Sequence, residues 1–346
     1  MKKVMGFIIS AVLIAGLLTG CFGSQAGNNV QPSVPETDQT EKTNTNTPEP
    51  DNSAEQPAWP RTVEDDFNHS ITLEKKPERV VVLYFGNIEN LVVLGHPPVG
   101  AAWADRAMNG FGTLKPYAEE IEIIDLGSPR EPSMERILEL SPDLIVGTAA
   151  HAEVYDDLNK IAPTLLFNSS EWKENLNNYA NFIGAEQVAE QFIGEVDSLM
   201  TEARDTLSAY SDKTFFFAWD QGKNTFYAFG TTATSQQAFF DKEIGLGLTA
   251  PSGYPQEGGK LSLESLAGLD PDYIFIVGEL GSAETGYQVS YLKADTEASS
   301  VWKSLTAVQS DNVYFLDPAC VTGSPLGVKM AIETIVDSLD VVSNTQ

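Results

Sequence analysis

The chain has 346 residues, with 21 lysines and arginines against 49 aspartates and glutamates, and a formal net charge of −28 at pH 7. This excess of negative charge argues against nucleic acid and anionic lipid as partners. It does not restrict a small ligand, because a local cleft can carry the opposite sign to the whole molecule.

The first residues have the pattern of an export signal. Lys2 and Lys3 precede an apolar stretch, Val4 to Leu18, and then come Thr19, Gly20 and Cys21. The stretch is shorter than the ~20 residues that span a bilayer, and small residues before a cysteine form a lipobox. We therefore expect a signal peptide over 1–20 and lipid attachment at Cys21. Cys320 then has no disulfide partner, and we expect a small buried thiol there.

Residues 21–60 differ in composition from the rest of the chain. They are rich in Asn, Thr, Gln, Glu and Pro, with no aromatic residue between Phe22 and Trp59. Such a segment cannot bury a core, so we expect a lipidated, disordered tether. The remaining stretch of about 280 residues is long for one core, which favours two lobes.

Strand and helix patterns alternate along this remainder. In the first part, 79–84, 99–103 and 121–125 read as strands and 90–95 as a helix that stops at Gly95. Residues 185–210 contain no proline and have apolar residues at helical spacing, which predicts one long amphipathic helix. Further strands are predicted at 214–219, 225–229 and 312–316. The pattern predicts an N-terminal α/β lobe over 61–184, a connecting helix over 185–210 and a C-terminal α/β lobe over 211–346.

A repeat links the two predicted lobes. Residues 132–147 and 261–275 share Ser, Glu, Leu, Pro, Asp and Ile at a constant offset, so that Glu135 corresponds to Glu264. In each copy a serine precedes a short helix, a Pro-Asp turn follows, and a β-rich run comes next. A helix-turn-strand unit is thus used once in each lobe.

Together with the motifs at 63–73, 76–82, 155–164 and 172–176, this repeat resembles the iron-siderophore substrate-binding lipoproteins of bacterial ABC importers. The resemblance implies two Rossmann-like α/β lobes joined by one long helix, with the ligand cleft between them. It also implies that Glu135 and Glu264 dock with permease subunits, a role that carboxylates can serve through charge-assisted hydrogen bonds to arginine. The other interpretation is that both are ordinary acids in the first turn of a helix.

The ligand that the resemblance implies is a ferric siderophore or ferric citrate. Ligands of open α/β sheets bind beyond the carboxyl ends of the strands, and a broad chelate needs aromatic walls and a few Arg or Tyr donors. The candidate ligand-binding residues are Tyr84, Trp103, Arg106, Arg130, His151 and Trp219. Relatives that bind hydroxamates or citrate commonly carry Arg before this histidine, where Ala150 stands here, so a neutral chelate stays open.

Other classes have less support. Haem, cobalamin or a catecholate could be bound by the same fold. A direct metal-ion site would need several converging His, Asp or Glu ligands, and the three histidines are His69, His96 and His151. Neither Gly-x-Ser-x-Gly nor Gly-x-x-x-x-Gly-Lys occurs. We expect a transport receptor without a cofactor or structural metal, and not an enzyme.

Overall fold

The computed structural model describes residues 59–343, apart from 169–170 and 233–236. They all belong to one compact unit, Glu55–Gln346. The predicted signal peptide, Cys21 and nearly all of the predicted tether lie outside the described residues. The two lobes are defined below by their sheets, and the lobe boundaries drawn from the sequence stay predictions.

The first lobe contains a parallel five-stranded sheet with the order β5-β4-β3-β8-β9. Its strands are β3 (Val80–Val82), β4 (Gly100–Ala101), β5 (Ile124–Asp125), β8 (Leu144–Gly147) and β9 (Thr164–Leu166). The helices are α1 (Ile88–Val93), α2 (Ala104–Gly110), α3 (Met134–Glu139), α4 (Tyr155–Asn159) and α5 (Trp172–Ile183). Two hairpins complete this part of the chain, β1 (Arg61–Glu64) with β2 (Ser70–Leu73) and β6 (Gly127–Ser128) with β7 (Glu131–Pro132). The strand order reverses at β3, and crevices form beyond the carboxyl ends of strands at such points.

The second lobe contains a mixed five-stranded sheet with the order β12-β11-β10-β13-β14. Its strands are β10 (Phe215–Gly222), β11 (Thr225–Ala228), β12 (Gly259–Ser262), β13 (Tyr273–Val277) and β14 (Val313–Leu316). The helices are α7 (Gln237–Phe240), α8 (Leu263–Leu269), α9 (Ala294–Ala298), α10 (Ser300–Ser304) and α11 (Thr306–Gln309). β10, β13 and β14 are parallel, whereas β11 and β12 are added antiparallel. Lys223 and Asn224 both have positive φ, 53° and 54°, as in the turns that join twisted antiparallel strands.

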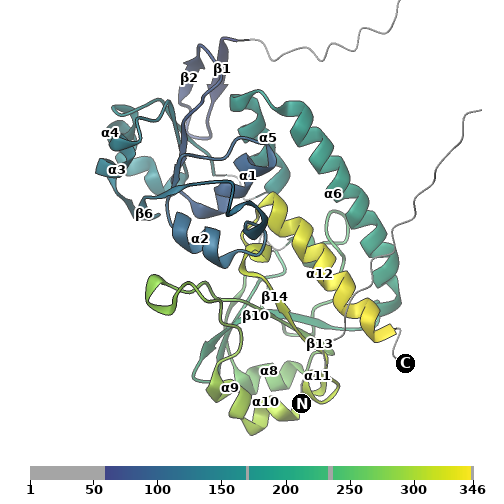
Figure 1. Ribbon diagram of the computed structural model, residues 1–346. Coiled ribbons are helices and arrows are strands. Elements are labelled where there is room, and N and C mark those ends of the chain that lie inside the picture. The colour runs from purple at the N-terminus through teal and green to yellow at the C-terminus, as the bar shows by residue number, and fades with distance from the viewer. Residues whose placement is uncertain (1–58, 169–170, 233–236, 344–346) are drawn as a thin grey trace, which may run out of the picture. The chain divides into compact units, whose positions relative to one another are not determined.

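Two long helices run beside each other along the molecule (Figure 1). α6 (Glu186–Leu207) confirms the predicted connecting helix, with a 3₁₀ turn at Ser208–Tyr210. Ala189 near its start packs in the core of the first lobe, whereas Leu207 at its end packs in the core of the second. α12 (Pro325–Ser343) contacts α6 and also α1 and α5 of the first lobe. The lobes therefore share two helical supports, one more than the sequence predicted.

The repeat has the same structural role in each lobe. Ser133 and Ser262 cap α3 and α8 by accepting hydrogen bonds from the backbone N–H groups of Arg136 (3.3 Å) and Ser265 (3.1 Å). Asp143 then accepts from the backbone N–H of Arg79 (2.9 Å), directly before β3.

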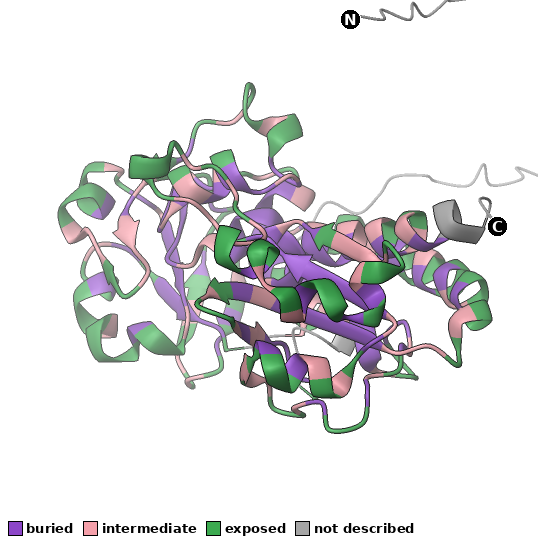
Figure 2. Cartoon of the chain, turned by 90° about the horizontal axis from the view of Figure 1, so that it is seen from below, coloured by how far each residue is buried: buried purple, intermediate pink, exposed green. Residues whose placement is uncertain are grey.

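In the second copy, Asp272 accepts from the backbone N–H of Thr214 (2.8 Å), directly before β10. Ser141 and Asp270, which correspond in the repeat, both have positive φ (45° and 37°). Each copy thus ends a helix with a left-handed residue and anchors the first strand of its own sheet. The central strands β3, β8 and β13 are buried, whereas many residues on the outer faces of the helices are exposed (Figure 2).

Candidate functional site

A cavity of about 700 Å³ lies where the two lobes face each other. This volume is within the range of small-molecule sites, roughly 300–1,000 Å³. The first lobe contributes Tyr84, Phe85, Trp103, Arg106 and Phe111 to its lining. The second lobe contributes Trp219, Asp220, Gln221, Gly278, Glu279, Leu280, Lys293, Pro318, Val321 and Thr322. Most of these residues lie just beyond the carboxyl ends of β3, β4, β13 and β14 or in the last half of β10, in keeping with the predicted position of the cleft.

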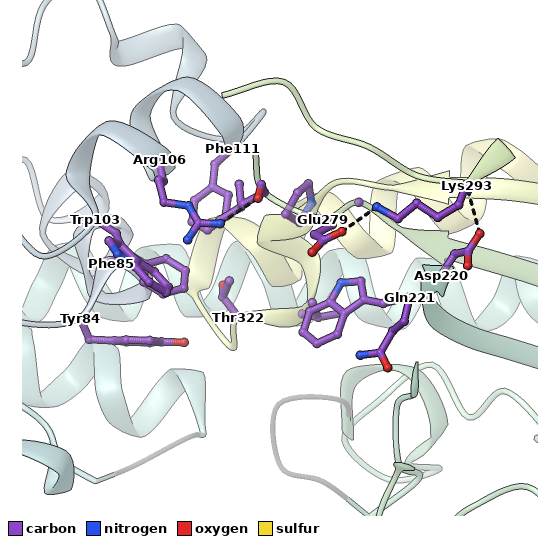
Figure 3. A pocket seen from close by; sticks show the side chains of 15 residues that line it. Tyr84, Phe85, Trp103, Arg106, Phe111, Asp220, Gln221, Glu279, Lys293 and Thr322 are labelled. Atoms are coloured by element: carbon purple, nitrogen blue, oxygen red, sulfur yellow. Dashed lines mark hydrogen bonds and ion pairs between the residues drawn. The ribbon is translucent and has the colours of Figure 1, made fainter. Parts of the chain in front are cut away.

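The wall from the first lobe is aromatic (Figure 3). Phe85 is at its centre, with ring centroids 4.7 Å from Tyr84, 5.4 Å from Trp103 and 5.8 Å from Phe111. Trp103 has φ of 53°, a conformation that a bulky residue rarely adopts. Burial raises the pKa of Tyr84, so this phenol is protonated at neutral pH and can donate a hydrogen bond to a ligand oxygen.

The wall from the second lobe combines one aromatic side chain with charged groups. Trp219 packs edge-on against Phe229, with centroids 4.7 Å apart. Its indole Nε1 is buried, and no hydrogen-bond partner is found for it among the described residues. Lys293 forms an ion pair with Glu279 (2.7 Å), and its backbone N–H donates to the buried carboxylate of Asp220 (2.8 Å). These charged groups are already paired with one another before any ligand enters.

Arg106 lies at the pocket but is bound to the opposite lobe. Its Nε donates to the carbonyl oxygen of Gly281 (3.0 Å) and its Nη2 to that of Leu280 (2.8 Å). The guanidinium carbon is also 4.4 Å from the ring centroid of Trp103. The side chain therefore connects the aromatic wall of one lobe to the backbone of the other.

Four of the six candidate ligand residues line the pocket, namely Tyr84, Trp103, Arg106 and Trp219. Arg130 does not, because the β6–β7 hairpin places it in an exposed turn. His151 does not line the pocket either, because its ring is buried and both ring nitrogens are hydrogen-bonded to the backbone. Nδ1 accepts from the backbone N–H of Thr148 (3.0 Å), so Nε2 carries the proton and donates to the carbonyl of Pro129 (2.8 Å). Desolvation lowers the pKa of His151, which keeps the ring neutral.

Several lining residues were not named among the sequence candidates. Phe85, Asp220, Gln221 and Glu279 lie in or just beyond the carboxyl ends of strands, so the rule that ligands bind at these ends could have indicated them. Phe111 follows the end of α2, and Lys293 precedes α9. Neither of these two follows a strand, so no sequence signal indicated them.

Glu135 and Glu264 lie away from the pocket. Both are exposed in the first turns of α3 and α8. In the part of the chain that the structure describes, neither carboxylate has an ion-pair or hydrogen-bond partner. Among the described residues, no cluster of His, Cys, Asp and Glu could hold a metal ion, and no helix has the length and apolar character needed to cross a membrane.

The fold and the cavity define a two-lobed α/β binding protein with its site at the lobe boundary. The periplasmic binding protein family model matches residues 80–320, and the chain belongs to this family. This is a family of substrate-binding proteins of transport systems and not of enzymes, which confirms the resemblance found in the sequence motifs.

Two relatives and one solved structure illustrate the similarity. The chain is 27% identical over 338 residues to the probable siderophore-binding lipoprotein YfiY of Bacillus subtilis, covering 96% of this chain and 95% of that protein. It is 29% identical to the iron(3+)-hydroxamate-binding protein FhuD of Bacillus subtilis, covering 79% and 84%. The crystal structure of BSU3320, a binding-protein component of a ferrichrome ABC transporter from Bacillus subtilis, is 27% identical with a TM-score of 0.61, covering 77% of this chain and 98% of that one.

Proposed function

We propose that this protein is an extracytoplasmic, lipid-anchored receptor that binds an iron(III) siderophore and delivers it to an ABC permease. The observation that carries the proposal is the cavity of about 700 Å³ at the lobe boundary. It has an aromatic wall, and the phenol of Tyr84 and the indole N–H of Trp219 are hydrogen-bond donors in its lining. Relatives named as siderophore-binding and hydroxamate-binding support the choice of ligand. Tyr84, Trp103 and Trp219 contact the chelate in this proposal, whereas Arg106 lines the cavity but is bound to the backbone of the opposite lobe.

The charges around the cavity favour a hydroxamate chelate over ferric citrate. Arg106 and Lys293 are balanced by Asp220 and Glu279 within the lining, and Lys293 is already paired. A strongly anionic chelate would gain little from this site and would lie close to two carboxylates. Three hydroxamates around iron(III) give a neutral complex, which suits a balanced, aromatic-walled cavity.

A quenching titration tests the ligand. Trp103 and Trp219 line the cavity, so a bound ferric chelate should quench tryptophan fluorescence. We expect ferrichrome, a neutral trihydroxamate, to bind more tightly than ferric dicitrate or a ferric tricatecholate. Haem and cobalamin belong in the same panel, because their absorbance reports binding directly. If no ferric chelate in the panel changes the fluorescence, the proposed ligand class is wrong.

The proposed docking surface for the permease is the exposed end of each repeat. Glu135 and Glu264 provide one carboxylate on each lobe, related by the repeat. Leu138 lies one turn beyond Glu135 on α3 and is 61% exposed, which provides apolar area beside the carboxylate. Charged and apolar groups in this combination suit a complementary arginine-bearing surface.

A transport assay separates docking from ligand binding. The double variant Glu135→Ala and Glu264→Ala should bind ferrichrome like the wild type but lose most ferrichrome uptake when it is the cell's sole receptor. The matched control is Glu153→Ala with Glu297→Ala, two exposed acids, one in each lobe, outside the repeat. Unchanged uptake in the docking variant would exclude these glutamates as docking groups.

The proposed anchor is a lipid on Cys21, in keeping with relatives named as lipoproteins. A membrane permease gains from a receptor held at the same surface, because tethering raises the effective concentration. Cys21→Ala should release the protein from the membrane fraction and abolish labelling by a clickable fatty acid. Retention of the label on this variant would place the lipid elsewhere.

A further inference from the structure

One segment of the second lobe extends to the first lobe beside the cavity. It runs from residue 279 to residue 291, between β13 and α9, and we call it the strap. Its neck is closed by two backbone hydrogen bonds between Glu279 and Ser290 (2.8 and 3.2 Å). Its tip is folded around a short 3₁₀ turn, Ala283–Thr285, that Ser282 caps. The strap is therefore a locally ordered unit, and in Figure 1 it reaches toward α2.

The base of the strap is fixed to its own lobe. Lys293 bonds to Glu279 (2.7 Å) and to the hydroxyl of Ser290 (3.0 Å), so it joins both sides of the neck. The backbone of the same lysine is held by the buried carboxylate of Asp220 (2.8 Å). Any movement of the strap relative to its lobe must therefore occur beyond the neck.

The tip is held to the first lobe by few and partly exposed contacts. Arg106 donates to the carbonyls of Leu280 and Gly281, as described above, and the hydroxyl of Tyr287 donates to Asp105 (3.4 Å). Most of the tip, residues 282–286, is exposed. Hydrogen bonds in such a position compete with water, so they can break without unfolding either lobe.

Leu280 adds a packing contact that lies close to a glycine. It packs against the hydrophobic core of the first lobe and also lines the cavity. A Cβ atom added to Gly110 at the end of α2 would lie 2.4 Å from Leu280 Cδ2. A side chain at residue 110 would therefore force the Leu280 side chain to move from its present position.

We propose that the strap closes the cavity at the lobe boundary and that Arg106 is its latch. This inference rests on the proposed function, because the cavity that the strap closes is the proposed siderophore site. Arg106 is then a positioning residue, whose fork of N–H groups holds two adjacent strap carbonyls. Release of the tip frees those N–H groups and opens one side of the cavity.

The first test needs no ligand. In Gly110→Ala the new methyl group should displace Leu280, and amide hydrogen exchange in peptides from the strap should become about tenfold faster, the factor expected for the loss of a single weak contact. Gly194→Ala on α6 is the matched control, because a Cβ atom there meets nothing within 4 Å. Tyr287→Phe is a milder variant that removes the Asp105 contact without altering the cavity lining. Equal exchange in all four proteins, wild type included, would overturn the latch.

The second test measures ferrichrome kinetics by stopped-flow quenching. Arg106→Lys keeps the charge but lacks the planar fork of N–H groups that fits two adjacent carbonyls, so ferrichrome dissociation should become about tenfold faster. Gly110→Ala should behave in the same way. If the strap opens in the exchange experiment but dissociation is unchanged, the strap does not close the cavity. If wild-type protein binds no chelate, the proposed function fails, while hydrogen exchange in the strap of Arg106→Lys and Gly110→Ala still decides whether Arg106 and Gly110 hold the strap.

Discussion

The two lobes meet at two junctions that differ in burial. At the α12 junction, Glu89 on α1 is 0% exposed. Its carboxylate accepts hydrogen bonds from the hydroxyls of Thr113 and Ser324 and from the backbone N–H of Gly327 (3.2 Å) in the first turn of α12. At the strap junction, Arg106 is only partly buried and binds two backbone carbonyls. One junction is a closed network inside the protein, and the other is open to water.

This difference indicates which side of the molecule can move. Breaking the Glu89 network would leave a carboxylate and two hydroxyls buried without partners. The free-energy penalty is about 1–3 kcal/mol for each neutral group and larger for the charged carboxylate. The strap carbonyls and the Arg106 guanidinium can bond to water when they separate, so their loss is much less unfavourable. We therefore expect lobe motion to pivot at the α12 junction and to open at the strap.

The largest expected effect is loss of stability in Glu89→Ala. The variant leaves the hydroxyls of Thr113 and Ser324 without their acceptor and creates a small cavity, so we expect a loss of about 3 kcal/mol in the free energy of unfolding. Urea unfolding followed by tryptophan fluorescence measures it. The matched control is Glu190→Ala on the exposed face of α6, which should lie within about 0.5 kcal/mol of wild type. A loss in Glu89→Ala no larger than that of the control would show that the network does not hold the lobes.

The next effect is a dependence of stability on pH. Desolvation raises the pKa of Glu89 to about 7 from 4.5, although the hydrogen bonds from Ser324 and Thr113 oppose the shift. Between these pH values the folded protein holds a proton that the unfolded chain has released. Stability from this group therefore falls as pH rises from 4.5 to 7, by up to about 1.4 kcal/mol per pH unit, and is constant above that window.

Other buried groups titrate near this window, so the measurement must be a difference. Burial raises the pKa of Asp317 in the same direction, whereas the lowered pKa values of His96 and His151 make stability fall as pH decreases. Glu89→Gln keeps the shape of the side chain and removes the titration, and it also replaces one acceptor oxygen by an NH₂ donor. That exchange of a hydrogen-bonding group shifts stability by an amount that does not vary with pH, so the test is the change of the difference with pH. The free energy of unfolding of the wild type minus that of Glu89→Gln should decrease from pH 5 to pH 7. A difference that does not change with pH would place the pKa of Glu89 outside that range.

Much of the fold could be predicted because it follows from local patterns. The buried runs around Val81 and Phe216 are strands, and proline-free helical spacing predicted α6. The repeat was detectable because both copies need the same capping serine and the same strand-anchoring aspartate. The antiparallel addition of β11 and β12 and the contact of α12 with the first lobe depend on tertiary packing, so no local pattern indicated them.

The candidate site was predicted less completely, for a physical reason. Residues at the carboxyl end of a strand, such as Trp219 within β10 and Tyr84 just beyond β3, are placed by the strand itself. Arg130 and His151 also follow strands. The β6–β7 hairpin places Arg130 in an exposed turn, and the ring of His151 is hydrogen-bonded to the carbonyl of Pro129. Lys293 lines the cavity because the strap brings the chain back beside Glu279, with which Lys293 forms an ion pair. No sequence signal indicated Glu89, because a single glutamate just before the helix predicted over 90–95 is typical of an exposed charge.

The smallest effect should come from the ion pair at the neck of the strap. Lys293 and Glu279 have side chains that are 30% and 62% exposed, and ion pairs in such positions contribute about 0–1 kcal/mol. Lys293→Met should therefore change the free energy of unfolding by less than about 1 kcal/mol, far less than Glu89→Ala. High salt should reduce the difference further, because it screens the exposed pair.

The same variant sharpens the comparison between the junctions. Lys293 holds both sides of the neck, so its loss should make hydrogen exchange in the strap faster while exchange in α1 and the first turn of α12 stays at the wild-type rate. The control Lys303→Met removes an exposed lysine from α10 that takes part in no ion pair within the described residues, and it should alter neither region. Faster exchange at both junctions in Lys293→Met would mean that the strap and the Glu89 network open together, and the pivot at α12 would then be wrong.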